Sequence, residues 1–167
     1  SGSSFILIDF MGVAPEHFGW WFMLIVAGYI GGSLFTARLS YRLPPMPIMI
    51  LGALLGLVSS GVMAWLAAAG WHHPLAVIGP MVFFTAAVGI TMPQAMSLAL
   101  APFADISATA SALLGFLQMG AAALVGVFVG ASLDGTALPM ALTMMAGAAV
   151  ALTGFYLLSR AETVCYD

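Results

Sequence analysis

Residues 43–104 read LPPMPIMILGALLGLVSSGVMAWLAAAGWHHPLAVIGPMVFFTAAVGITMPQAMSLALAPFA and contain no formally charged side chain. As a single helix this stretch would be roughly 90 Å long, whereas the hydrocarbon core of a membrane is about 30 Å thick. The chain must therefore turn back within it. The polar interruption is GWHHP, where Gly70 can end one helix and Pro74 can sit in the first turn of the next. This pattern predicts two membrane spans, at 46–69 and 75–100.

Composition indicates the solvent for which the chain is built. Hydrophobic residues make up 63% of its 167 residues and charged residues only 5%, whereas about a quarter of a typical soluble domain is charged. Such a chain cannot cover itself with a water-compatible surface, so the lipid bilayer is the expected partner. The net charge of -3 is spread over distant sites. It offers no basic stripe for a phosphate backbone, so nucleic acid is not expected as a partner.

The remaining charges and turns divide the rest of the chain into further spans. Asp105 is expected to cap the start of one helix, and Asp134 with the following glycine to form the turn before the next. The apolar run FILIDFMGV at the front is too short to cross alone, so we expect the chain to begin inside a helix. The fold class predicted is an all-α membrane protein, a helical bundle of five full transmembrane helices plus a truncated first helix. The predicted spans are 1–13 (partial), 17–37, 46–69, 75–100, 106–131 and 137–159.

The three basic residues indicate a topology. If the connection around Arg38 and Arg42 faces the cytoplasm, four further crossings return the chain to that side at Arg160, as the positive-inside rule prefers. The tryptophans then all fall at the outer interface, where indole rings settle. We therefore interpret the three arginines as topology anchors and expect a multi-pass protein with a cytoplasmic C-terminus. The tryptophans concerned are Trp20, Trp21, Trp65 and Trp71.

Small residues recur at a spacing of four in three of the predicted spans. A row of this kind makes a shallow groove along one helix face, which lets a neighbouring helix approach closely. The pattern predicts a packed bundle rather than a string of separate anchors. The rows are Gly28 and Gly32; Gly52, Gly56 and Ser60; and Ala122, Gly126 and Gly130.

Polar side chains at membrane depth make up the candidate site. Pro93 removes one helix donor and is expected to bend the chain beside Thr91 and Gln94, while Ser111 and Gln118 share a face of the next span. An amide facing lipid would be unsatisfied, so both glutamines should face protein or a wet cavity. Two interpretations stay open, hydrogen bonding between helices or the wall of a solute pathway. The cavity-wall candidates are Tyr29, Thr91, Gln94, Ser111 and Gln118, and Met92, Met96 and Met119 could add a deformable surface.

Several kinds of chemistry are not expected. No carboxylate, lysine or histidine lies at the centre of a full span, where proton-coupled transport usually needs an ionisable group. His72 and His73 have no carboxylate or cysteine nearby in the sequence, so no metal site is expected. Ser59 and Ser60 have no base with which to form a protease site. The chain is therefore predicted not to be an enzyme and to carry no cofactor.

The run GITMPQAMSLALAPFADISATASALLGFLQMGAAALVGVFVGASLDGTALPMA, residues 89–141, resembles the bicyclomycin-resistance (Bcr/CflA) type of multidrug efflux transporter in the major facilitator superfamily. The likeness covers the MPQA kink, the LAPF helix end, the SALLGFLQ face and the DGTALPM turn. At the front, SGSSFILIDFMGVAPEHFG is similar to the end of the seventh helix in the same group. The resemblance implies the C-terminal half of a twelve-helix exporter of the bacterial inner membrane.

That family works by alternating access, with the substrate cavity between two six-helix halves. The resemblance therefore implies proton-coupled efflux (antiport) of drugs or small solutes, with a missing N-terminal six-helix half as partner and as the source of the proton-carrying acid. The alternative from another class is a non-transporting membrane scaffold or assembly subunit, in which the polar groups only hold partners together.

Overall fold

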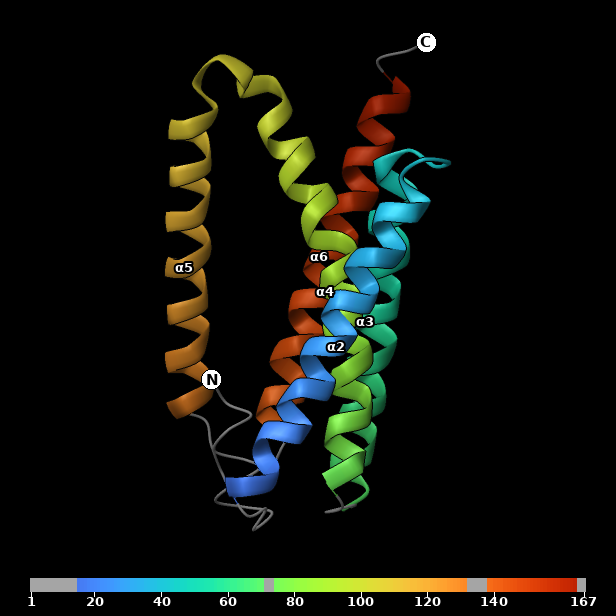
Figure 1. The fold of residues 1–167 in the computed structure, drawn as a ribbon, viewed down its shortest axis with the longest axis vertical. Helices are drawn as coiled ribbons and strands as arrows, with labels where there is room; N and C mark the ends of the chain where they lie inside the picture. Colours follow the sequence, from blue (N-terminus) through green and yellow to red (C-terminus); the bar gives the residue numbers. More distant parts are fainter. Residues whose placement is uncertain (1–14, 71–73, 132–137, 165–167) are drawn as a thin grey trace.

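The computed structural model describes residues 15–70, 74–131 and 138–164, and these are helical apart from the short connections. The helices run up and down in an antiparallel arrangement (Figure 1). The expected partial span at 1–13 lies outside the described residues. The elements are α2 (Pro15–Leu39), α3 (Pro45–Ala68), α4 (Pro74–Leu100), the 3₁₀ segment η2 (Ala101–Ile106), α5 (Ser107–Ala131) and α6 (Leu138–Val164).

Proline and glycine set most helix boundaries. Helices α2, α3 and α4 begin at Pro15, Pro45 and Pro74. Proline suits the first helical position because its missing N–H would have no partner there and its φ angle is already helical. Gly70 follows the end of α3 with a φ of +71°, a left-handed conformation that glycine adopts without steric cost. The expected end of a helix at this glycine is therefore confirmed.

The predicted count of five full spans plus a truncated one is not matched. Four segments of the described chain are long and apolar enough to cross a membrane: Gly19–Leu39, Pro45–Ala68, Val77–Ala131 and Met140–Leu158. The third has 55 residues because η2 continues the helical backbone from α4 into α5. Asp105, expected as an N-cap, lies inside η2 instead. The chain reverses there near Phe103, whose φ of −112° and ψ of 32° are not helical.

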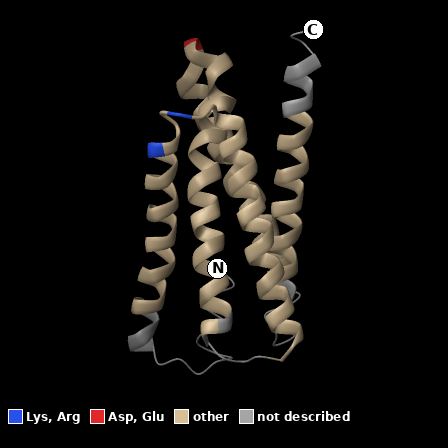
Figure 2. Ribbon diagram, turned by 90° about the vertical axis from the view of Figure 1, so that its right-hand side faces the viewer, with Lys and Arg blue, Asp and Glu red and all other residues tan. Residues whose placement is uncertain are grey.

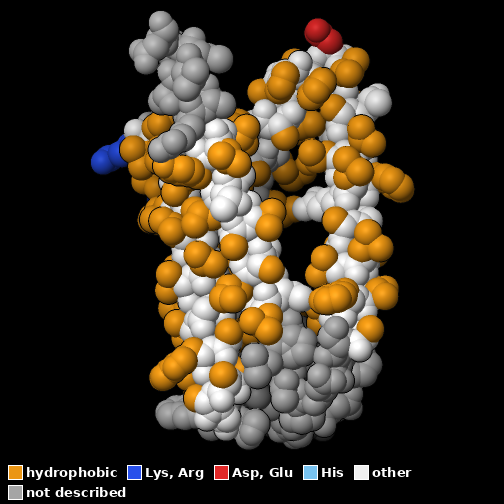
Figure 3. Space-filling view, turned by 180° about the vertical axis from the view of Figure 1, so that it is seen from behind, with side chains coloured by type: hydrophobic (Ala, Val, Ile, Leu, Met, Phe, Trp, Pro, Cys, Tyr) orange, Lys and Arg blue, Asp and Glu red, His pale blue; other side chains and the backbone are white. Residues whose placement is uncertain are grey.

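Helix α4 is the centre of the packing. It contacts α2 along one side and α3 along another, and α6 packs on the far side of α3. By contrast, α5 has few contacts with its neighbours. Figure 1 shows it standing beside the bundle, and the space-filling view in Figure 3 shows an opening between it and the rest of the molecule. The described part of the chain is thus a four-helix body with a fifth helix held mainly at its ends.

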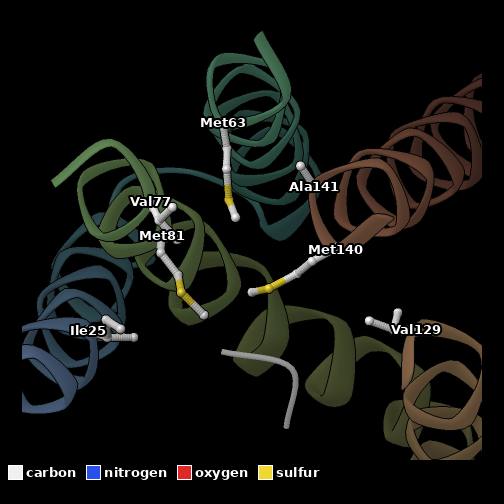
Figure 4. Packing of buried hydrophobic residues seen from close by; sticks show 7 residues of the cluster. All are labelled: Ile25, Met63, Val77, Met81, Val129, Met140 and Ala141. Carbon is white, nitrogen blue, oxygen red and sulfur yellow. The ribbon is translucent and has the colours of Figure 1, made fainter. Parts of the chain in front are cut away.

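A cluster of buried apolar residues joins all five helices at the end of the bundle where α2 begins. Figure 4 shows the side chains of Met63, Met81 and Met140 converging from three different helices. Unbranched thioether side chains suit such an irregular junction because they adapt to the space available. Val129, the buried residue of α5, joins the same cluster. This contact ties the end of α5 to the body.

The α2–α4 seam is a backbone-to-backbone contact. A Cβ atom added to Gly32 would overlap the carbonyl oxygen of Ala86, and one added to Gly89 would overlap that of Tyr29. At these two positions only glycine leaves room for the backbone of the facing helix. The expected close approach at Gly28 and Gly32 is therefore confirmed.

The other two small-residue rows have different surroundings. A Cβ atom on Gly52 would meet the side chains of Thr91 and Ile90, so this row also packs closely against α4. On α5, however, nothing lies within 4 Å of a Cβ atom placed on Gly130. The expected packing of the row on α5 is not found among the described residues.

Hydroxyl groups fasten the seam at two levels. Thr85 Oγ1 of α4 donates a hydrogen bond to the Ile25 carbonyl of α2 over 2.9 Å. Thr36 Oγ1 of α2, which is only 2% exposed, donates to the Ile90 carbonyl of α4 over 3.3 Å. The bond from Thr36 is buried and the bond from Thr85 is partly buried, so water competes less for them than at the surface.

Thr85→Val should lower the stability of the folded protein by about 0.5–1.5 kcal/mol, the range for one hydrogen bond between membrane helices. The matched control is Thr153→Val on α6, because the Thr153 hydroxyl donates only to carbonyls of its own helix. Thermal unfolding of the purified protein in detergent measures both. Equal effects of the two substitutions would show that the bond to Ile25 does not stabilise the seam.

Candidate functional site

The candidate site is an open groove between α4 and α5. It has a volume of about 440 Å³, and nearly all of its surface is apolar. The two helices are joined at one end by η2 and at the other by the cluster around Val129, so the groove lies between two fixed points. Its lining residues are Met92, Ala95, Met96 and Ala99 of α4 and Leu114, Leu117 and Gln118 of α5.

Gln118 supplies the amide group of this groove. Its Nε2 atom lies 3.9 Å from Met92 Sδ, and a thioether is a weak acceptor. Its carbonyl oxygen accepts no hydrogen bond from any residue that the structure describes, and the side chain is exposed. An amide of this kind can hydrogen-bond to a molecule that enters the groove. Gln118, predicted as a cavity-wall residue, thus lines the α4–α5 groove.

Gln94 has a different environment. Its Nε2 atom donates to Ser40 Oγ just beyond the end of α2, and Ser40 Oγ donates to the Thr36 carbonyl over 2.8 Å. With the bond from Thr36 to Ile90, these side chains link α4 to the end of α2. Of the two interpretations left open for the glutamines, this arrangement favours hydrogen bonding between helices for Gln94.

The other three wall candidates do not line the α4–α5 groove. Thr91 lies against α3, and its hydroxyl donates to the Ala87 carbonyl of its own helix. Ser111 is exposed on α5, and its hydroxyl donates to the Ala108 carbonyl. Tyr29 is 38% exposed on α2. The structure therefore brings only Gln118, of the five candidates, into the groove.

Two of the three methionines that were expected to form a deformable surface beside Gln118 line the groove. Met92 and Met96 line the groove, as expected of a deformable wall. Met119 is 71% exposed and is not among the lining residues. Pro93 lies between the two lining methionines, and α4 runs through both Pro93 and Pro80 without a break. In Figure 1 the half of α4 that carries Pro93 leans toward α5.

Sequence reasoning missed the two threonines of the seam and Ser40. The signal was present, because Thr36 and Ser40 continue the row of Gly28 and Gly32 at the same spacing of four. A hydroxyl that extends a small-residue row lies on the face that meets the neighbouring helix. It is therefore placed to bond to that helix.

Charged side chains lie at the two-arginine end of the bundle. Arg38 is in the last turn of α2, Arg42 follows in the connection to α3, and Asp105 is in η2. In Figure 2 the ribbon positions coloured as basic or acidic lie at one end of the bundle. Helix α6, which carries Arg160, ends there too (Figure 1). Trp20 and Trp65 lie toward the opposite end, and both are exposed.

Metal and cofactor sites have little support in the described part of the chain. No three His, Cys, Asp or Glu side chains come together among these residues. His72 and His73 lie outside them. The groove itself presents two methionine sulfur atoms and one amide on an otherwise apolar surface.

One comparison with known proteins gives a match. The chain is 25% identical over 161 residues to an uncharacterized MFS-type transporter, YdgK, of Bacillus subtilis (strain 168). The match takes in 96% of this chain and 39% of that protein, so the chain spans about two fifths of the length of the curated relative. No protein-family model and no solved structure matches. The long apolar helices fit a multi-pass membrane protein, and the protein to which this chain is similar is a transporter of the MFS type.

Proposed function

We propose that the chain is the C-terminal six-helix half of a major facilitator transporter of the Bcr/CflA type, which exports drugs or small solutes by proton antiport. The observation that carries the proposal is the open groove between α4 and α5, in which one amide faces an otherwise apolar wall. The similarity to an MFS-type transporter supports the same class. On this proposal the protein lies in the bacterial inner membrane, with its C-terminus and arginines in the cytoplasm.

The depth of the amide supports a solute pathway. From Ser107 to Gln118, α5 rises by about 16 Å, which is half the thickness of the hydrocarbon core. An unpaired amide at that depth is costly in lipid. The cost falls if the open side of the groove faces a wet cavity instead. In a major facilitator transporter that cavity lies between the two halves at the midplane.

Proton coupling would need a group from elsewhere in the protein. Among the described side chains, the acidic and basic ones lie at one end of the bundle, and the groove has no ionisable side chain. We therefore place the proton-carrying acid in the N-terminal half. The residues of the present chain would contribute solute binding and the moving wall.

Transport by the full-length protein in sealed vesicles tests the proposal. With an imposed pH gradient, we expect movement of a drug-like solute that stops when an ionophore collapses the gradient. A panel of apolar drugs and small solutes identifies the compound. Proton-independent leakage alone, or no movement of any compound, would contradict the proposal and favour the non-transporting scaffold.

Gln118→Leu should weaken binding of the transported compound about five- to tenfold, because it removes one hydrogen bond worth about 1 kcal/mol. Membrane insertion should be normal, since leucine suits the apolar wall. Ser111→Ala on the same helix is the control, because the Ser111 hydroxyl bonds only within α5. Binding affinity and resistance are measured for both variants. Unchanged affinity in Gln118→Leu would remove this residue from the site.

A further inference from the structure

A second groove lies on the outer surface of the bundle, between α3 and α6. It has a volume of about 490 Å³ and a wholly apolar surface. It is separate from the α4–α5 groove, with which it shares no residue. Its lining residues are Ile50 and Leu54 of α3 and Leu152, Thr153, Tyr156 and Leu157 of α6.

The groove keeps hydrogen-bonding atoms away from its contents. The Thr153 hydroxyl donates to the carbonyls of Ala149 and Val150, over 3.0 and 2.9 Å, and so is satisfied within its own helix. A polar solute entering the groove would lose bonds to water at a wholly apolar surface. Hydrocarbon loses nothing there, so the surface is selective for an acyl chain.

The position of the groove matches the depth of acyl chains in one leaflet. Along α3, Ile50 lies about 7 Å and Leu54 about 13 Å from Pro45, the first residue of the helix. On the other wall, Leu157 lies about 10 Å from the end of α6. The groove therefore begins just beneath the two-arginine end and runs toward the membrane centre.

Charge at this end favours one kind of headgroup. Arg42 is exposed in the connection that leads directly into α3, and the first turn of α3 has no acidic residue. Asp105 is at the same end, but it belongs to η2. Figure 3 shows the described acidic and basic side chains at opposite sides of this end. A basic side chain at the membrane surface attracts anionic lipid in preference to zwitterionic lipid.

From these observations we propose that the α3–α6 groove binds a phospholipid of the leaflet at the two-arginine end. One acyl chain lies against Leu54 and Leu157, and the anionic headgroup pairs with Arg42. The site is a lipid site on the outside of the bundle. It is independent of solute transport and of the Bcr/CflA assignment.

A third apolar groove, between α3 and α4, provides an internal control. It has a volume of about 360 Å³ and an apolar surface, and it lies toward the opposite end of the bundle. Outside the grey parts, Figure 2 colours no basic or acidic residue at that end. An acyl chain could enter it, but a headgroup would find no described partner. Its lining residues are Val58, Ser59, Val62, Leu66, Gly79, Pro80 and Phe83.

Photocrosslinking tests the site directly. The full-length protein is placed in phosphatidylcholine vesicles that contain a trace of phosphatidylglycerol with a diazirine on its acyl chain, and crosslinked peptides are mapped by mass spectrometry. We expect crosslinks to concentrate on residues 50–54 and 152–157. The same diazirine on phosphatidylcholine should label these segments about fivefold less. Labelling spread evenly over the exposed helix faces would overturn the proposal.

Two pairs of variants separate the headgroup from the groove. Arg42→Ala should lower phosphatidylglycerol labelling about fivefold, while Arg42→Lys should keep it, because both lysine and arginine carry a positive charge. Leu54→Trp should block labelling by filling the groove, and Val62→Trp in the α3–α4 groove should not. Equal labelling by both lipids, or no change in Arg42→Ala, would overturn the anionic assignment.

Discussion

Gly32→Ala should destabilise the protein by about 1–3 kcal/mol, the usual cost of overpacking a tightly fitted contact. The added Cβ atom would overlap the carbonyl oxygen of Ala86 on α4. A backbone carbonyl cannot rotate away as a flexible side chain can, so α2 and α4 must separate. Separation would also weaken the hydrogen bonds from Thr36 and Thr85, which depend on the same spacing.

The adjacent residue gives a matched control. Gly31 lies in the same helix, and nothing is within 4 Å of a Cβ atom placed on it. Gly31→Ala should leave stability unchanged or raise it slightly, since alanine has the higher helix propensity. The two variants are heated in detergent side by side, and the unfolded fraction is measured as the aggregated protein on size-exclusion chromatography. If Gly32→Ala were as stable as Gly31→Ala, the close approach of α2 and α4 would be wrong.

Ala95→Trp should reduce transport by the full-length protein at least tenfold, because the indole ring would occupy much of the α4–α5 groove. Loss of binding by one order of magnitude needs only about 1.4 kcal/mol, and excluding a solute from its site costs more than that. The effect should appear as lost solute binding in the purified protein as well as lost flux in vesicles. Insertion and yield should stay normal, since tryptophan tolerates a membrane environment.

Val150→Trp is the control for added bulk. Val150 is 71% exposed on α6 and lines none of the grooves described above. The same increase in size there should leave binding and flux at the parental level. Normal flux in Ala95→Trp would show that solutes do not pass through this groove, whereas equal loss in both variants would indicate a general folding defect.

Much of the fold could be predicted from local signals. Pro74 begins a helix as expected, and Gly70 ends one, because each acts through its own backbone geometry. The turn within the uncharged stretch followed from membrane thickness alone. The reversal at η2 was expected near its observed place, but its form was not. A 3₁₀ segment continues the helical backbone where the sequence predicted a new helix with Asp105 as its N-cap.

The candidate site was less predictable because it depends on how each helix is oriented about its own axis, and so on which of its faces meets a neighbour. Gln94 and Gln118 look alike in the sequence, since both are amides in apolar spans. One bonds to Ser40 across the seam, and the other faces the groove. Which face meets a neighbour is decided by the combined packing of several helices. The spacing of four from Gly28 to Ser40, and from Gly52 to Ser60, did carry that information in the sequence.

The glycine seam also has a mechanical consequence. Ordinary helix pairs are separated by a layer of side chains that can change rotamer and so absorb small displacements. Between α2 and α4 the backbones touch at Gly32 and Gly89, so this cushioning layer is absent there. The two helices are therefore expected to move as a rigid pair at this contact. We therefore expect that a displacement of α4 at the groove would move α2, and with it the connection at Ser40, as one unit.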